Sequence, residues 1–274
     1  FFFLEVVKHK GHALLCASWA IKGDREVVFE AVKQDWGALQ HASTELKLDR
    51  DFAFAAIEQA WISIKYLAAS LRDDRKIVLE AVKLNGKALR YASSRLREDR
   101  EVVLQSILQK GTNLEYAGGI LKKDRKIVLA AIKQNDRALQ YSEFRGDFEV
   151  VLEAVKKHGR ALEFASPELK SNREIVLRAV KTHGRILYFS SIELRDDNEI
   201  VLRAVKQESE ALQYASKRLK NDSEIALEAV KQNGDVLRYA SPELRDGGLK
   251  KLIHTLLEAQ RGLLEVMLAA SLVR

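Results

Sequence analysis

The apolar residues of this chain recur in clusters with helical spacing. From Asp74 the sequence reads DRKIVLEAVKLNGKALRYASSRLRE, with apolar side chains at its fourth, fifth, sixth, eighth and ninth positions. On a helix these positions cover roughly 200° of the surface. A band this wide indicates a helix packed between two neighbours, rather than a helix lying on one surface.

The whole cluster repeats along the chain. Complete units begin at Asp24, Asp49, Asp74, Asp99, Asp124, Asp147, Asn172, Asp197 and Asp222. The step is 25 residues everywhere except from Asp124 to Asp147, where it is 23. Residues 1–23 read as a tenth unit without its first two positions. Because one unit cannot bury its own apolar band, the pattern predicts an all-α fold, an α-solenoid of about ten 25-residue helical repeats over residues 1–246.

Each unit also carries signals for its helix ends. We expect Asp or Asn at position 1 to cap a helix of about 11 residues. Gly is common at position 13, as in Gly86 and Gly111, and we expect it to close that helix in the left-handed conformation. Positions 15–19 predict a short second helix, with the aromatic residue of position 18 in the core. Ser at position 20 and Leu at position 23 predict one more buried turn.

The 23-residue step contains the tripeptide Arg145-Gly146-Asp147, which resembles the sequence that adhesion receptors read. The repeat offers a simpler interpretation, because Arg145 falls on the basic position 24 and Asp147 on the cap position of the next unit. We interpret the tripeptide as repeat residues, and we expect the array to tighten or kink at this shortest junction.

Composition narrows the classes of protein. Pro occurs only at Pro167 and Pro242, which argues against disorder and all-β folds. Cys16 is the single cysteine, so the chain forms no intrachain disulfide and fits a reducing compartment. No run of about 18 apolar residues predicts a transmembrane helix. The net charge of +7 permits an acidic partner without requiring one.

Motifs for catalysis are missing from the sequence. It has no phosphate-binding loop, dinucleotide fingerprint or metalloprotease motif. His158 and His183 share position 12 in successive units, but two imidazoles alone make a poor metal site. We interpret Cys16 as a small buried side chain. We therefore expect a protein that is not an enzyme and binds no cofactor or metal.

Two sets of residues are candidates for partner binding. Stacking would align the lysines of position 10 in a basic row: Lys8, Lys33, Lys83, Lys133, Lys156, Lys181, Lys206 and Lys231. Such a row suits an acidic or phosphate-bearing partner, whereas Glu three residues before Lys33 offers local pairing instead. Trp36 and Trp61 hold position 13 in successive units. They either form an exposed anchor or fill gaps in the packing.

The unit resembles a known repeat. The stretches DREVVFEAVKQDWGALQHASTELKL from Asp24 and DSEIALEAVKQNGDVLRYASPELRD from Asp222 are similar to the repeat catalogued as domain of unknown function 4116, and the resemblance covers about residues 1–246. It implies a helical repeat of the kind found in bacteria, protists and algae. It implies no catalytic residues and no agreed activity.

Our hypothesis is a non-catalytic scaffold for protein–protein interaction, as an accessory subunit of a larger assembly. One alternative is nucleic-acid binding through the rows of Lys and of Arg at position 2. Another, suggested by the occurrence in algae, is a plastid subunit that docks on a membrane complex. Residues 247–274 break the repeat and predict an amphipathic cap, either one helix or a helical pair. The alternative is peripheral docking of this segment on a partner or membrane.

Overall fold

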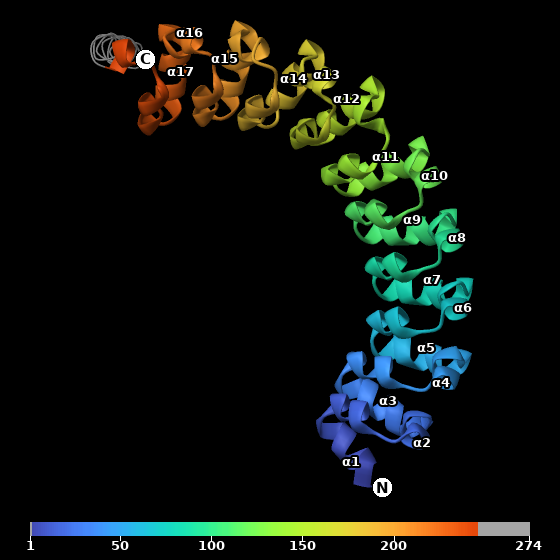
Figure 1. Ribbon diagram of the computed structural model, residues 1–274. Coiled ribbons are helices and arrows are strands. Elements are labelled where there is room, and N and C mark those ends of the chain that lie inside the picture. The colour runs from blue at the N-terminus through green and yellow to red at the C-terminus, as the bar shows by residue number, and fades with distance from the viewer. Residues whose placement is uncertain (1, 246–274) are drawn as a thin grey trace, which may run out of the picture. The chain divides into compact units, whose positions relative to one another are not determined.

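The computed structural model describes residues 2–245, in which each repeat unit is a succession of helices (Figure 1). A long α-helix leads into a 3₁₀ helix, and a short α-helix or 3₁₀ turn follows. These residues contain no strand. The chain is an all-α solenoid, and the predicted fold class is confirmed. The predicted cap at 247–274 lies outside the described residues.

The chain divides into two compact parts, residues 1–144 and 145–274. We call them the N-terminal part and the C-terminal part. The division falls between Phe144 and Arg145, inside the junction that the sequence marks as the shortest.

In the N-terminal part the long helices are α1 (Phe2–His9), α3 (Arg25–Gln34), α5 (Arg50–Gln59), α7 (Arg75–Leu84), α9 (Arg100–Gln109) and α11 (Arg125–Gln134). The 3₁₀ helices are η1 (Gly11–Cys16), η2 (Trp36–His41), η3 (Trp61–Tyr66), η4 (Gly86–Tyr91), η5 (Gly111–Tyr116) and η6 (Asp136–Tyr141). The short helices are α2 (Trp19–Lys22), α4 (Thr44–Leu48), α6 (Ala69–Arg72), α8 (Ser94–Arg97) and α10 (Gly119–Lys122). Within this part α4, α6, α8 and α10 follow one another along one side (Figure 1).

In the C-terminal part the long helices are α12 (Phe148–Lys157), α14 (Arg173–Val180), α15 (Asn198–Gln207) and α17 (Ser223–Gln232). The 3₁₀ helices are η8 (Gly159–Phe164), η9 (Gly184–Phe189), η11 (Ser209–Tyr214) and η12 (Gly234–Tyr239). The short helices are α13 (Pro167–Lys170) and α16 (Lys217–Lys220). Two units have a 3₁₀ turn in the place of the short helix, η7 (Phe144–Gly146) and η10 (Leu194–Asp196).

The residue at position 1 caps every long helix of a complete unit, as predicted. The Asp24 carboxylate, for example, accepts hydrogen bonds from the backbone N–H groups of Glu26 and Val27 at 3.0 and 3.1 Å. These donors would otherwise have no partner in the first turn. The capping residues are Asp24, Asp49, Asp74, Asp99, Asp124, Asp147, Asn172, Asp197 and Asp222.

The core lies between successive long helices. In α7 the side chains of positions 4, 5, 8 and 9 are buried, while Leu79 at position 6 is only half-buried. Leu96 at position 23 is also fully buried. The wide apolar band of the sequence is therefore explained by contact with a unit on either side.

The role predicted for the glycine of position 13 is wrong. Within the described residues no glycine has a positive φ, and Gly86 and Gly111 begin the 3₁₀ helix instead of closing the α-helix. The reason for Gly is space, because a Cβ on Gly86 would lie 2.8 Å from the carbonyl oxygen of Ser106 in the next unit. A Cβ on Gly111 would meet the carbonyl group of Ala131 in the same way. Successive units approach one another most closely at this position.

A backbone hydrogen bond joins each unit to the next. The N–H of position 20 donates to the carbonyl oxygen of position 24 in the preceding unit. In the N-terminal part the pairs are Ser43 to Lys22, Ala68 to Lys47, Ser93 to Arg72, Gly118 to Arg97 and Glu143 to Lys122. In the C-terminal part they are Ser166 to Arg145, Ser191 to Lys170, Ser216 to Arg195 and Ser241 to Lys220. The donor–acceptor distances lie between 2.8 and 3.3 Å.

Arginines of position 2 form a second ladder between units. Each guanidinium reaches the capping aspartate of the following unit: Arg25 to Asp49, Arg50 to Asp74, Arg75 to Asp99, Arg100 to Asp124 and Arg173 to Asp197. Arg75 and Arg173 also pair with Glu101 and Glu199. This arginine row is thus engaged within the array.

We predict that Gly111→Ala destabilises the N-terminal part by about 1–3 kcal/mol, because the added methyl group must displace the backbone of the next unit. Gly119→Ala is the matched control, since Gly119 is exposed, begins a helix and has nothing within 4 Å of an added Cβ. It should be neutral or slightly stabilising. Urea denaturation of both variants measures the difference, and equal stabilities would contradict the close-approach explanation.

We also predict a stability loss below about pH 4. The hydrogen bond from Arg50 holds the pKa of Asp74 below its ordinary value, aided by backbone N–H groups and opposed by burial. A lowered folded-state pKa stabilises the protein above the unfolded-state pKa, and this stabilisation is lost as pH falls through the folded-state value. Arg50→Gln should therefore flatten the dependence of the melting temperature on pH between about 2 and 5.

Arg90→Gln is the control for this experiment, because it removes the same charge from an arginine that forms no ion pair among the described residues. If Arg90→Gln flattens the pH dependence as much as Arg50→Gln does, the effect comes from net charge and not from the ladder.

Candidate binding surfaces

The lysines of position 10 are all exposed, but several are paired. Lys33 pairs with Glu30 at 2.6 Å, Lys83 with Glu80 at 3.2 Å and Lys231 with Glu228 at 3.6 Å. These are the local pairs that the sequence offered as the alternative to a binding row. Within residues 2–245 no ion pair is formed by Lys156, Lys181 and Lys206. The predicted row is therefore interrupted by carboxylates, and Lys133 belongs to it as a further exposed member.

The two tryptophans have different surroundings. Trp36 is 38% exposed and stacks on Tyr66 of the next unit, with ring centroids 5.9 Å apart and an angle of 22° between the planes. Trp61 is half-buried. Trp36 thus combines the two predicted roles, because one side of the ring is packed and the rest faces solvent.

The prediction that position-18 aromatics lie in the core is wrong. The half-buried members are Tyr66, Tyr91, Tyr116, Tyr141, Tyr214 and Tyr239. These tyrosines end a 3₁₀ helix, which has three residues per turn and aligns positions three apart. In η4 and its C-cap, Leu89 and Ala92 share a buried side, Lys87 and Arg90 share an exposed side, and Tyr91, which follows the buried Ala88, is itself only half-buried.

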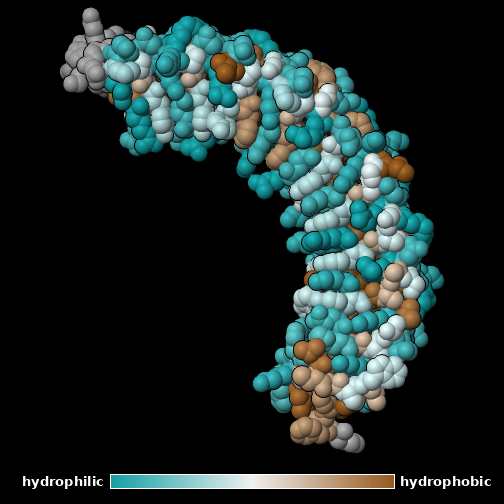
Figure 2. Space-filling model, viewed as in Figure 1, coloured by the Kyte–Doolittle hydropathy of each residue, from teal (hydrophilic) through white to brown (hydrophobic). Residues whose placement is uncertain are grey.

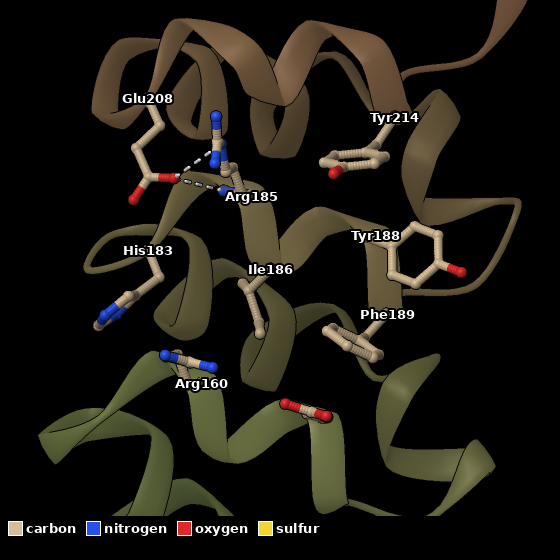
Figure 3. Close-up of a pocket in the computed structure, with 9 residues that line it drawn as sticks. Arg160, His183, Arg185, Ile186, Tyr188, Phe189, Glu208 and Tyr214 are labelled. Carbon is tan, nitrogen blue, oxygen red and sulfur yellow. Dashed lines mark hydrogen bonds and ion pairs between the residues drawn. The ribbon is translucent and has the colours of Figure 1, made fainter.

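The C-terminal part has a hollow lined by aromatic and charged side chains from η8, η9 and η11 (Figure 3). Its volume is about 590 Å³. Tyr188 is 52% exposed, and its ring centroid lies 5.1 Å from Phe189 and 5.2 Å from Tyr214. Three aromatic rings thus form one wall.

Two arginines make contacts at the hollow, one with the aromatic wall and one with the glutamates beside it. The Arg195 guanidinium donates to the backbone oxygen of Tyr188 at 2.6 Å and lies 5.7 Å from the ring centroid. Arg185 pairs with Glu210 at 3.2 Å, and its backbone N–H donates to Glu208 at 3.1 Å. Arg160 also lines the hollow and forms no ion pair with any described residue. The hollow therefore places three aromatic rings beside charged side chains, among which Arg160 has no ion-pair partner in residues 2–245.

Sequence reasoning missed this site, although a signal was present. Position 17 is polar in most units, as in Gln40 and Arg90, whereas GRILYF from Gly184 has Tyr188 there. An aromatic side chain at an exposed 3₁₀ position is a departure from the repeat that no packing requirement explains.

Other predicted features can be placed as well. Cys16 is exposed, so its assignment to the core is wrong, for the same reason as for the position-18 tyrosines. In the described part of the chain, no three His, Cys, Asp or Glu side chains are grouped to hold a metal ion. Over residues 2–245, no helix combines the length and apolar character needed to cross a bilayer.

The tripeptide at the short junction is built into the fold. Arg145 donates to the backbone oxygen of Phe164 at 2.9 Å, and Asp147 caps α12 through the Val150 N–H at 2.9 Å. Asp147 thus serves as the cap that the repeat predicts, and Arg145 links its unit to the next one.

The fold defines a helical-repeat protein of the solenoid class. The sequence model of a domain of unknown function (DUF4116) matches residues 2–47, 24–72, 49–97, 74–118, 99–145, 147–195 and 197–245. The chain belongs to this family, as its resemblance suggested. No curated protein and no solved structure matches the chain.

We predict that the stack of Trp36 on Tyr66 couples the two side chains by about 0.5–1.5 kcal/mol. A double-mutant cycle of Trp36→Ala and Tyr66→Ala, read by urea denaturation, measures this coupling. The pair of Trp61→Ala with Tyr141→Ala, whose rings form no contact, is the control. Additive effects of Trp36→Ala and Tyr66→Ala would show that the stack contributes no stability.

Proposed function

We propose that this protein is a non-catalytic scaffold that binds other proteins, as an accessory subunit of a larger assembly. The observation that carries the proposal is the aromatic wall of Tyr188, Phe189 and Tyr214. Tyr and Trp carry a large share of the binding energy of protein interfaces, and they do so best when they are already held in place. The Arg195 guanidinium donates to the backbone oxygen of Tyr188 and lies 5.7 Å from the centroid of its ring, which supports the position of this side chain.

The surroundings of the wall strengthen the proposal. The surface in Figure 2 is mostly hydrophilic, with apolar side chains in separate places. Tyr188 is 52% exposed and holds a position that is polar in most units. Apolar side chains at variable surface positions suit contact with a partner, because the core does not need them.

The recurring polar side chains make contacts within and between the repeat units. Asp residues cap helices, Arg residues link neighbouring caps, and glutamines of position 11 bridge units. Gln109, for example, accepts from the Gly86 N–H at 2.6 Å and donates to the Val82 oxygen at 2.6 Å. Residues with these structural duties are poor candidates for chemistry on a substrate, which favours binding over catalysis.

Nucleic-acid binding is less well supported as a general function of the array. Arginines of position 2 are paired with aspartates, and part of the lysine row is paired with glutamates. Neighbouring carboxylates reduce the attraction that such rows exert on phosphates.

We predict that the hollow is required for capture of partner proteins. Affinity capture from extracts of the source organism, followed by mass spectrometry, should recover a defined set of proteins with the wild-type chain. Tyr188→Ala combined with Tyr214→Ala should reduce that set at least tenfold, because both rings leave the wall. The matched control is Ile192→Ser, which removes an exposed apolar side chain from the same repeat unit outside the hollow.

Recovery of the same proteins by the double variant would contradict a role for the hollow. A substrate turnover that depends on polar side chains of the array would contradict the scaffold proposal as a whole.

A further inference from the structure

Four tyrosines follow the 3₁₀ helices of the N-terminal part. Tyr66, Tyr91, Tyr116 and Tyr141 end η3, η4, η5 and η6, and all four are half-buried. Burial raises the pKa of Tyr116 first, with a further contribution from Glu115 and smaller ones from Tyr141 and Tyr91, against a lowering by Arg90. Successive 3₁₀ helices from η3 to η6 also pack against one another, so the tyrosines that end them form a row.

Four cations border this row. They are Lys65, Lys87, Arg90 and Arg137, at positions 14 and 17 of the 3₁₀ helices, and all are exposed. Among the described residues their side chains form neither an ion pair nor a hydrogen bond. Glu115 is the single carboxylate at positions 14 and 17 of these four units. We call the four tyrosines and four cations the basic tyrosine face.

These cations differ from the other basic rows. Arg50 and Arg75 are held by aspartate caps, and Lys83 is held by Glu80. Lys47 and Lys122 at position 24 donate to the backbone oxygens of Gln40 and Glu115, at 2.6 and 2.8 Å. Unlike these groups, the cations of the basic tyrosine face pair with no carboxylate among the described residues, and an acidic partner would supply their counter-charges.

The corresponding face of the C-terminal part lacks this imbalance. Positions 14 and 17 of its units carry three cations and three carboxylates: Arg160, Arg185 and Arg238 against Glu163, Glu210 and Asp235. The excess of positive charge is thus a local property of the N-terminal part, and not a consequence of the repeat.

The tyrosine rings favour a polypeptide over a nucleic acid. Stacking of bases needs open ring faces. Tyr66 has Trp36 stacked against it, and the Lys65 ammonium lies 5.0 Å from its ring centroid. The Arg90 guanidinium lies 6.0 Å from the centroid of Tyr91. The edges and hydroxyl groups remain for contact, and these suit hydrogen bonding and packing against a peptide.

The repeat also sets a spacing for the partner. Packed helices lie about 8–10 Å apart, so the tyrosines recur at about that interval. Three of the four units, all except the one from Asp99, add one or two cations beside the tyrosine. A polyproline II segment rises about 9.3 Å over three residues, which is one turn. An acidic side chain at every third residue of such a segment would therefore face one unit after another.

From these observations we infer that the basic tyrosine face binds an extended acidic segment of a partner protein, with Asp or Glu at about every third residue. This inference rests on the proposed scaffold function, since it names the chemistry of one partner. It concerns a surface separate from the hollow at Tyr188.

The test uses the full chain and fluorescein-labelled peptides in fluorescence anisotropy. The probe is a peptide of four Glu-Pro-Ala repeats, and its control has Gln in place of every Glu. We expect the acidic peptide to bind with a dissociation constant of about 10–100 μM, which is typical of short unstructured ligands. The Gln peptide should bind at least tenfold more weakly. A peptide with the same composition but its four Glu in one block tests the spacing, and it should also lose affinity.

Two protein variants locate the site. Lys87→Gln combined with Arg90→Gln should weaken the acidic peptide about tenfold, as expected for loss of about 1.4 kcal/mol. Lys76→Gln combined with Lys126→Gln removes the same net charge from exposed positions on α7 and α11, and it should leave the affinity unchanged. Equal weakening by both pairs would overturn the inference, because it would reduce binding to net charge.

A single-stranded oligothymidylate of matched charge is the competing ligand at the same ionic strength. If the oligothymidylate binds as tightly as the acidic peptide, with the same dependence on Lys87 and Arg90, the inference is overturned in favour of nucleic acid. Absence of peptide binding would also overturn it. If capture through Tyr188 and Tyr214 persists in either case, the scaffold proposal stands and only the partner at this face is wrong.

Discussion

The backbone hydrogen bond between positions 20 and 24 of successive units fixes the register of the array. Because it joins main-chain groups, it does not depend on the side chain, and Ala68, Gly118 and Glu143 donate as well as the more common Ser. Its effect is visible at the shortened unit, where two residues are missing before Phe144. The short helix there is reduced to the turn η7, yet Glu143 and Ser166 still bond to the preceding units at 3.3 and 2.8 Å. The loss of two residues is absorbed without loss of register.

This fixed register determines which charged side chains are partly buried and which are exposed. A group that is partly buried needs a partner, because desolvation without compensation is costly. Lys47, whose pKa is lowered by burial, donates to a backbone oxygen at the end of its 3₁₀ helix. Exposed positions have no such requirement, and at positions 14 and 17 of the 3₁₀ helices the residues vary from unit to unit. The repeat thus separates the charged side chains that link neighbouring units from those that form no such link.

The sequence predicts the fold well because the period, the caps and the apolar positions act within one unit or between identical neighbours. Asp at position 1 and Leu at position 23 could be assigned for this reason. Gly at position 13 could not, because its cause is the approach of a carbonyl group such as that of Ser106 in the next unit. The tyrosines of position 18 were misplaced because an apolar pattern does not separate a 3₁₀ turn from an α-helical one over six residues.

The candidate surfaces were harder to predict than the fold, for a related reason. Lys83 and Lys87 are both lysines in one unit, but only the structure shows that the first is paired with Glu80 and the second is not. Tyr188 was visible as a departure from the repeat, yet its value as a binding residue depends on Arg195 and Tyr214 from neighbouring elements. A constant scaffold with variable 3₁₀ surfaces lets the N-terminal part offer unpaired cations and the C-terminal part an aromatic wall. Since the two surfaces differ in charge and shape, the proposed scaffold function would use them for chemically different partner segments.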